Sequence, residues 1–291
     1  MRDLLQLLVS GTATGTTYAL AGLGFTLLWQ ASGTINFAQG EFVMVPAFLM
    51  LFVLSAGAPL FVAFLVACLA SMVLLGWAFK RGVVDPMRGH GVINLVIATL
   101  GLSIGLKQLV KAGYSAEAHP FPNPFPEALF SVGGLRVSEA DIGTLAVALV
   151  IVLGLQLFLS RTLTGRAMQA CAQNPEAARV LGINVNRMIL YTFVANGALA
   201  ATTALLVTPT YLAKFDMGDA IGLKAFFAAI IGGFNQPRGA LLGGVLVGVL
   251  EGLMGHYVSA SYREAAGLLL FLAVILFRPE GLLGKAEERK V

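Results

Sequence analysis

The chain has 291 residues, of which 57% are hydrophobic and only 12% are charged, with a formal net charge of +4. A soluble domain carries charge on roughly a quarter of its residues, so this composition excludes an ordinary water-soluble protein. The 34 glycines suit closely packed membrane helices. We therefore expect an integral membrane protein that folds as a single transmembrane domain over residues 1–291.

Two cysteines, Cys68 and Cys171, and three widely separated histidines are the only residues of these two types. Their spacing matches neither a disulfide framework nor a metal site, so we interpret the cysteines as packing residues and expect no metal. No basic run interleaved with aromatic residues occurs. The net charge therefore indicates loop topology and not a nucleic-acid partner.

Apolar runs of about 20 residues, long enough to cross a membrane, recur along the chain. The first, 4–29, is too long for a cleaved signal, and its Asp3 nearly cancels Arg2. Runs 41–56 and 239–256 each begin after a glycine-rich break, and the run 221–234 is short for a span. The other expected spans are 59–79, 92–112, 141–160, 188–208 and 264–278. The sequence predicts an all-α polytopic membrane helix bundle with eight or nine transmembrane or re-entrant segments, two of them broken.

Charges in the connecting loops predict the orientation. Basic residues outnumber acidic ones in 80–91, in the polar segment 161–187 and in the C-terminal tail, whereas acidic residues outnumber the one arginine in 113–140. The positive-inside rule places the first three in the cytosol and 113–140 outside. Spans 92–112 and 141–160 then join opposite sides, as they must. The proline-rich 113–140 suits either a stiff surface loop or a docking surface for an external partner.

A short motif recurs in the two halves of the chain. GTINFAQG at 33–40 aligns without gaps with GGFNQPRG at 232–239, and the first glycine, the asparagine and the last glycine are identical. Paired glycine-interrupted segments in the two halves are typical of transporters built from repeats. Broken helices at membrane depth are tolerated where they are buried in protein or line a cavity.

The polar segment 161–187 lies between two long apolar runs. Its NPE sequence at 174–176 is a strong helix start, because Asn is a favoured N-cap, Pro suits the first helical position and Glu opposes the positive helix end. Gly182 is a natural C-terminal cap. We predict a helix of about two turns over 175–181. So short a helix is marginal alone in water, and it must pack on the rest of the chain or on a partner.

Four segments together resemble one family. They are GTINFAQGEF (33–42), GRAMQACAQNPEAARVLGIN (165–184), IIGGFNQPRGALLGGVLVGVLEG (230–252) and LFRPEGLLG (276–284). In this order, over nearly the whole chain, they are similar to LivH-type permeases, the membrane subunits of branched-chain amino acid ABC importers. The resemblance implies a bacterial inner-membrane subunit that pairs with a LivM-like permease, two ATP-binding cassette subunits and a periplasmic substrate-binding protein. It also makes 113–140 a periplasmic loop.

The resemblance implies one set of functional residues, and the polar residues at the two glycine-rich breaks suggest a second set. Segment 161–187 would be a cytoplasmic coupling loop that seats in the ATPase through Arg166, Asn174, Glu176, Ala177, Arg179 and Gly182. The substrate pathway would include Asn36, Gln39, Gly40, Glu41 and Asn235, because amide side chains can meet the charged groups of an amino acid. Glu41 has an alternative role as a helix cap, and Glu251, in an apolar run, has a structural or subunit-interface alternative.

We expect no catalytic residues and no bound cofactor. The chain lacks the G-x-x-x-x-G-K-[ST] phosphate loop, so ATP would be used by a partner ATPase. An ABC permease for urea or short amides is an alternative function. A self-sufficient secondary transporter is another; it explains broken helices but not a capped cytosolic helix. An intramembrane enzyme has no Ser/His, metal-ligand or paired-carboxylate arrangement to support it. The sequence leaves open whether the second permease is a different chain or a second copy.

Overall fold

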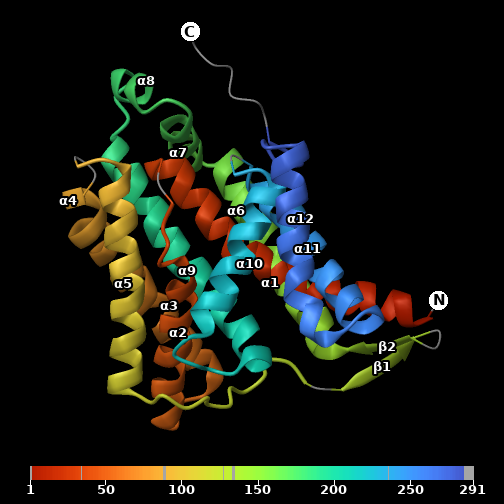
Figure 1. Ribbon diagram of the computed structural model, residues 1–291. Coiled ribbons are helices and arrows are strands. Elements are labelled where there is room, and N and C mark those ends of the chain that lie inside the picture. The colour runs from red at the N-terminus through yellow and green to blue at the C-terminus, as the bar shows by residue number, and fades with distance from the viewer. Residues whose placement is uncertain are drawn as a thin grey trace. The chain divides into compact units, whose positions relative to one another are not determined.

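The computed structural model describes residues 2–33, 35–87, 90–126, 128–132, 135–234 and 236–284 (Figure 1). Within these ranges the strands are β1 (Leu129–Val132) and β2 (Leu135–Ser138), which form an antiparallel hairpin with Leu129 opposite Ser138. The sequence did not predict this hairpin, although both strands contain the large apolar residues that favour extended backbone. The rest of the regular structure is helical, which confirms the all-α class.

The α-helices follow one another along the whole chain. They are α1 (Arg2–Ser32), α2 (Gln39–Ser55), α3 (Leu60–Ser71), α4 (Asp85–Met87), α5 (Val92–Gly113), α6 (Glu139–Arg161), α7 (Leu163–Gln173), α8 (Pro175–Val180), α9 (Val185–Tyr211), α10 (Met217–Gly232), α11 (Pro237–Tyr257) and α12 (Arg263–Phe277). Each of the nine predicted apolar runs coincides with a helix. Both predicted breaks are present, because helical structure stops between α1 and α2 and again between α10 and α11.

Six helical stretches among the described residues are long and apolar enough to cross a membrane. They are Leu60–Met87, Val92–Gly113, Glu139–Arg161, Val185–Tyr211, Pro237–Tyr257 and Ala260–Phe277. Large apolar side chains on them face outward: Ile93 of α5 is 74% exposed and Val150 of α6 is 69% exposed. Contiguous exposed apolar surface of this kind requires lipid or another protein to cover it. The chain is a multi-pass membrane protein.

The helix that begins with α3 runs further than the sequence predicted. After α3 the chain continues as a π-helix over Met72–Ala78 and Lys80–Val84 and then enters α4. Residues 80–87 of the predicted loop 80–91 are therefore helical. Lys80 is only 3% exposed, and its ammonium is paired with Asp85, so the helical segment tolerates a buried lysine at this position.

The described chain forms two compact units. Unit 1 comprises residues 1–26, 125–152 and 223–291, and unit 2 comprises residues 27–124 and 153–222. The single permease domain over 1–291 stays a prediction.

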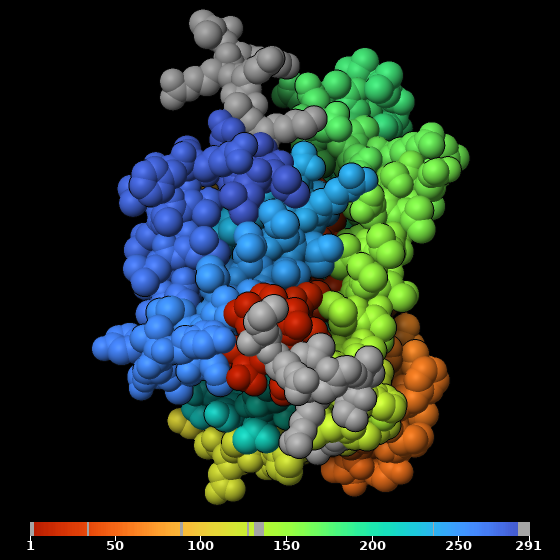
Figure 2. Space-filling model, turned by 90° about the vertical axis from the view of Figure 1, so that its right-hand side faces the viewer, coloured from red at the N-terminus to blue at the C-terminus, as the bar shows by residue number. Residues whose placement is uncertain are grey.

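In unit 1, α1 and α11 touch through their backbones. A Cβ atom on Gly15 would lie 2.6 Å from the carbonyl oxygen of Gly244, and one on Gly248 would lie 2.4 Å from that of Gly11. Four-residue spacing on both helices builds this contact, which is the usual way for membrane helices to approach closely. α11 also packs beside α12, and the two form a continuous blue surface in Figure 2.

In unit 2, aromatic rings join α2, the π-helix and α9. Phe79 packs edge-on against Phe42 at 5.0 Å between ring centroids and lies 5.7 Å from Phe193. The two ends of unit 2 differ. At one end Lys80 hydrogen-bonds Asn186 at the start of α9. Near the other end of α9, His119 and Ala213 exchange backbone hydrogen bonds. The basic loops therefore share one end of unit 2, and the first part of 113–140 lies at the other. Which end faces the cytosol stays a prediction.

The glycine contact in unit 1 generates a testable prediction. Gly248→Ala places a methyl group against the backbone of α1, so we expect a loss of about 1–3 kcal/mol from overpacking. Thermal unfolding of the detergent-solubilised protein measures it. Gly154→Ala is the control, because a Cβ atom on Gly154 meets nothing within 4 Å and alanine favours a helix. Equal thermal stability of the two variants would contradict the packing role of Gly248.

Candidate functional site

The polar segment contains two helices, α7 and α8. At the start of α7 the Thr162 hydroxyl accepts a hydrogen bond from the Gly165 N–H at 2.9 Å, and at the start of α8 the Asn174 side chain accepts one from the Ala177 N–H at 2.9 Å. The sequence indicated the second cap, but a helix was predicted only over 175–181 and not over Leu163–Gln173. The difference follows from the amphipathic pattern of α7, which buries Met168 and Cys171.

α8 ends at a glycine in the left-handed conformation. Gly182 has a φ of 81°, and its N–H and that of Ile183 bond to the carbonyls of Arg179 and Ala178, each at 3.0 Å. Most other residues are strained at such a φ. α8 therefore has a fixed start and a fixed end although it is only six residues long.

One side of α8 is anchored and the other is uncovered. Ala178 is 2% exposed and belongs to the core of unit 2, whereas Val180 is 88% exposed and Leu181 is 78% exposed. Glu176 and Arg179 are exposed as well. Adjacent large aliphatic side chains left in water favour a partner surface. Sequence reasoning missed Val180 and Leu181. The signal was two large aliphatic residues directly before a capping glycine in an otherwise polar segment.

The other predicted coupling residues have local roles. Arg166 donates from Nε to the Ser160 carbonyl at 3.1 Å and so holds the turn between α6 and α7, while Ala177 is exposed on α8. Cys171 is 3% exposed, and its burial raises the pKa of the thiol. A protonated, buried thiol fits the packing role predicted for this cysteine.

The predicted pathway residues gather where α2 begins. Asn36 is 5% exposed; its Oδ1 accepts from the Ala38 N–H at 3.0 Å, and its Nδ2 has no partner among the described residues. Gly40 is pressed against the first turn of α10, since a Cβ there would lie 2.0 Å from the Gly218 carbonyl oxygen. Asn235 lies outside the described residues.

Gln39 belongs to a buried amide pair. Its side chain exchanges two hydrogen bonds of 3.0 Å with Asn196 of α9, and both residues are at most 1% exposed. This reciprocal pair locks α2 to α9, because an unpaired buried amide costs on the order of 1–3 kcal/mol. Asn196 was not singled out from the sequence, where it is a lone polar residue in an apolar span.

Glu41 and Lys107 form the charged centre of this region. Glu41 is 1% exposed; its Oε1 lies 3.6 Å from the Lys107 ammonium, and its Oε2 has no hydrogen-bond partner among the described residues. The same ammonium lies 2.6 Å from Asp219, whose side chain is 60% exposed. Two carboxylates thus flank one cation. This arrangement can bind a zwitterion in place of its internal ion pair. The ammonium of the zwitterion would pair with a carboxylate of the site, and its carboxylate would pair with Lys107.

Glu251, in unit 1, has three polar partners at one of its carboxylate oxygens. Its Oε2 accepts from the Tyr18 hydroxyl at 3.0 Å and from the Lys224 ammonium at 3.2 Å, and the Arg263 Nε lies 3.9 Å away. Glu251 is 1% exposed and Lys224 is 6% exposed. These contacts fit the structural alternative for Glu251. Lys224 was missed, although a lysine in the apolar run 221–234 is the expected partner of a membrane carboxylate.

Comparison with known proteins identifies a family and several relatives of the chain. Residues 7–278 match the family model described as the permease component of branched-chain amino acid transport systems. The chain is 34% identical to the high-affinity branched-chain amino acid transport permease BraD of Pseudomonas aeruginosa, over 99% of this chain and 98% of that protein. It is 32% identical to LivH of Escherichia coli K12, over 99% and 97%, and 29% identical to a probable LivH of Methanocaldococcus jannaschii, over 91% and 88%. No solved structure matches the chain significantly.

The buried cluster around Glu251 predicts strong coupling between two substitutions. Lys224→Met removes the ammonium that pairs with the buried carboxylate of Glu251, so we expect the free energy of unfolding to fall by roughly 3–5 kcal/mol. The double variant Lys224→Met/Glu251→Leu removes both charges and is expected to be more stable than Lys224→Met alone. Thermal unfolding of the purified protein compares them. A double variant that is less stable than Lys224→Met alone would show that the two charges do not act as a pair.

Proposed function

This chain belongs to the family of permease components of branched-chain amino acid transport systems, and on that premise we propose that it forms the membrane pathway of an ATP-driven importer for branched-chain or other neutral amino acids. Members of the family are transport subunits and not enzymes, and ATP hydrolysis belongs to a separate subunit. Such permeases work with ATPase and binding-protein partners.

The proposed assembly places the chain in the bacterial inner membrane beside a LivM-like second permease, with two ATP-binding cassette subunits in the cytosol and a periplasmic binding protein outside. This chain binds no cofactor of its own, and ATP is used by its partner. The observation that carries the proposal is α8, which is capped at both ends and exposes Val180 and Leu181 beside Glu176 and Arg179. An ATPase groove that covers these side chains would couple its closure to α9, which follows α8 directly.

The substrate pathway is proposed to pass the start of α2. In this proposal the amino acid's ammonium approaches Glu41 and its carboxylate approaches Lys107, while Asp219 holds Lys107 when the site is empty. The support is geometric: Glu41 has a free carboxylate oxygen among the described residues, and Lys107 already bridges two carboxylates. The buried amide of Asn36 adds an unused donor in the segment leading into α2. A substrate without opposite charges, such as urea, would gain little from this ion pair.

The coupling role is tested by Val180→Ser/Leu181→Ser in the assembled, reconstituted transporter. We expect ligand-stimulated ATP hydrolysis and uptake to fall about tenfold or more, because each aliphatic side chain is worth about 1.5–3 kcal/mol when a partner buries it. Protein level in the membrane should not change, since both side chains are exposed in the chain itself. The control is Leu163→Ser, at an 85% exposed position on α7. Normal coupling in the double variant would remove α8 from the ATPase contact.

The pathway role is tested by Lys107→Met. We expect leucine uptake to fall about tenfold or more, since a hydrogen bond to a charged group contributes about 1.5–3 kcal/mol, and Lys107→Arg should restore part of it. Lys111→Met is the matched control, because Lys111 lies on the same helix and stacks on Phe215 at 5.2 Å without contacting Glu41. Uptake of radiolabelled leucine and urea by proteoliposomes is the measurement. If neither the native chain nor the Lys107→Met variant transports leucine, and the variant transports urea normally, the urea alternative is correct.

A further inference from the structure

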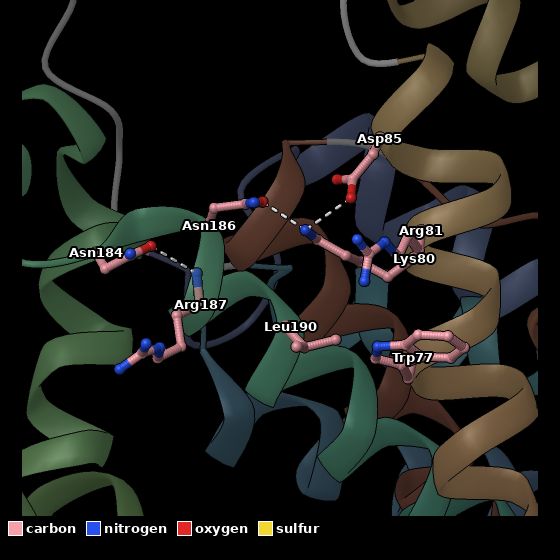
Figure 3. Close-up of a pocket in the computed structure, with 8 residues that line it drawn as sticks. All are labelled: Trp77, Lys80, Arg81, Asp85, Asn184, Asn186, Arg187 and Leu190. Atoms are coloured by element: carbon pink, nitrogen blue, oxygen red, sulfur yellow. Dashed lines mark hydrogen bonds and ion pairs between the residues drawn. The ribbon is translucent and has the colours of Figure 1, made fainter.

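A basic cavity of about 380 Å³ lies where the π-helix meets the start of α9 (Figure 3). The side chains that carry the argument are Trp77, Lys80, Arg81, Asp85, Asn186 and Arg187, all of unit 2. Figure 3 shows the Lys80 ammonium in the middle of the group, between Asp85 and Asn186. Neither the proposed pathway nor the proposed coupling contact uses this cavity.

The cavity carries excess positive charge. Three cations line it against one carboxylate, and the Lys80 ammonium is already held 2.9 Å from that carboxylate, on Asp85. Arg81 and Arg187 form no salt bridge with any residue that the structure describes, and both are exposed. Two guanidinium groups therefore remain for an anion. Guanidinium groups bind phosphate oxygens with paired, charge-assisted hydrogen bonds.

The surface next to the cavity changes from apolar to aromatic to basic along one helix. Leu69 is 63% exposed, Val73 is 54% exposed and Trp77 is 45% exposed, and the Arg81 guanidinium stacks 5.7 Å from the centroid of the Trp77 ring. Steps of four residues keep these side chains near one side of the helix. Exposed Trp and Arg at the end of an apolar span are typical of the membrane–water interface. This side of the helix thus offers apolar surface for an acyl chain, followed by cations for a headgroup.

We propose that this cavity binds the phosphate headgroup of an anionic phospholipid from the cytosolic leaflet, with an acyl chain along Leu69 and Val73. Basic pockets between membrane helices on the cytosolic side are suited to such headgroups. The uncompensated charge of Arg81 and Arg187 selects a headgroup with net negative charge over a zwitterionic one, whose ammonium would meet like charge. The cavity lies at the basic end of unit 2, the end that also starts α9.

The test measures the lipid that the permease complex retains. The complex is purified with its partner subunits from its native membrane. The complex is placed in nanodiscs of equal phosphatidylglycerol and phosphatidylcholine, released gently, and its bound lipids are counted by native mass spectrometry. We compare the native chain with Arg81→Gln/Arg187→Gln. The control is Arg161→Gln/Arg278→Gln, which removes two cations at other helix ends. Parallel samples contain millimolar inorganic phosphate, which separates a lipid headgroup from free phosphate.

The expected result is selective retention of phosphatidylglycerol by the native chain and by the control, and a loss of about tenfold or more in the cavity variant, because each of the two lost charged contacts lowers affinity by roughly tenfold. Equal retention in the native chain and the cavity variant overturns the proposal. So does equal retention of the two lipids, or displacement of the lipid by inorganic phosphate. Loss of the ATPase subunit from the cavity variant with lipid retention unchanged also overturns it and assigns the cavity to a protein contact.

Discussion

Backbone-to-backbone contact at glycine is the constraint on which both units depend. Lipid tails are as apolar as the helix surfaces, so no hydrophobic force drives membrane helices together, and close packing must supply the attraction. In unit 1 this contact joins α1 to α11 through Gly15 and Gly244. In unit 2 it joins α2 to α10 through Gly40 and Gly218. The second contact also brings two helix starts together, which is what places Glu41 and Asp219 on either side of Lys107.

Glu41 and Glu251 are both buried, but their surroundings differ. The Oε2 atom of Glu251 meets three donors from three different helices, two of them cationic, so its negative charge is compensated and it joins those helices. Glu41 has one cation, 3.6 Å from its Oε1, and its Oε2 lacks a hydrogen-bond partner among the described residues. An incompletely satisfied buried carboxylate is costly and persists where function requires it. The difference between the two sites follows from their surroundings and not from their positions in apolar runs.

Sequence reasoning succeeded where the physical cause is local. The nine apolar runs were predictable because lipid demands long apolar helices, and the ends of α8 were predictable because Asn174 and Gly182 act on neighbouring backbone. It failed where the cause is contact between distant segments. The partners Asn196 of Gln39, Asp219 of Lys107 and Lys224 of Glu251 follow from which helices pack together. The same holds for the π-helix after α3, whose charged end is held by Asn186 of α9, 106 residues later.

α9 has the dimensions of a lever. It runs unbroken from Val185 to Tyr211, 27 residues, so its axis is about 40 Å long. Its first residues follow α8, its middle carries Asn196, and the residues just past its end are tied to His119. Rotation by about 5° around its first turn would swing the far end by about 3.5 Å over that length. A displacement of that size exceeds the length of a hydrogen bond, so a small movement imposed at one membrane surface is enough to remake polar contacts at the other.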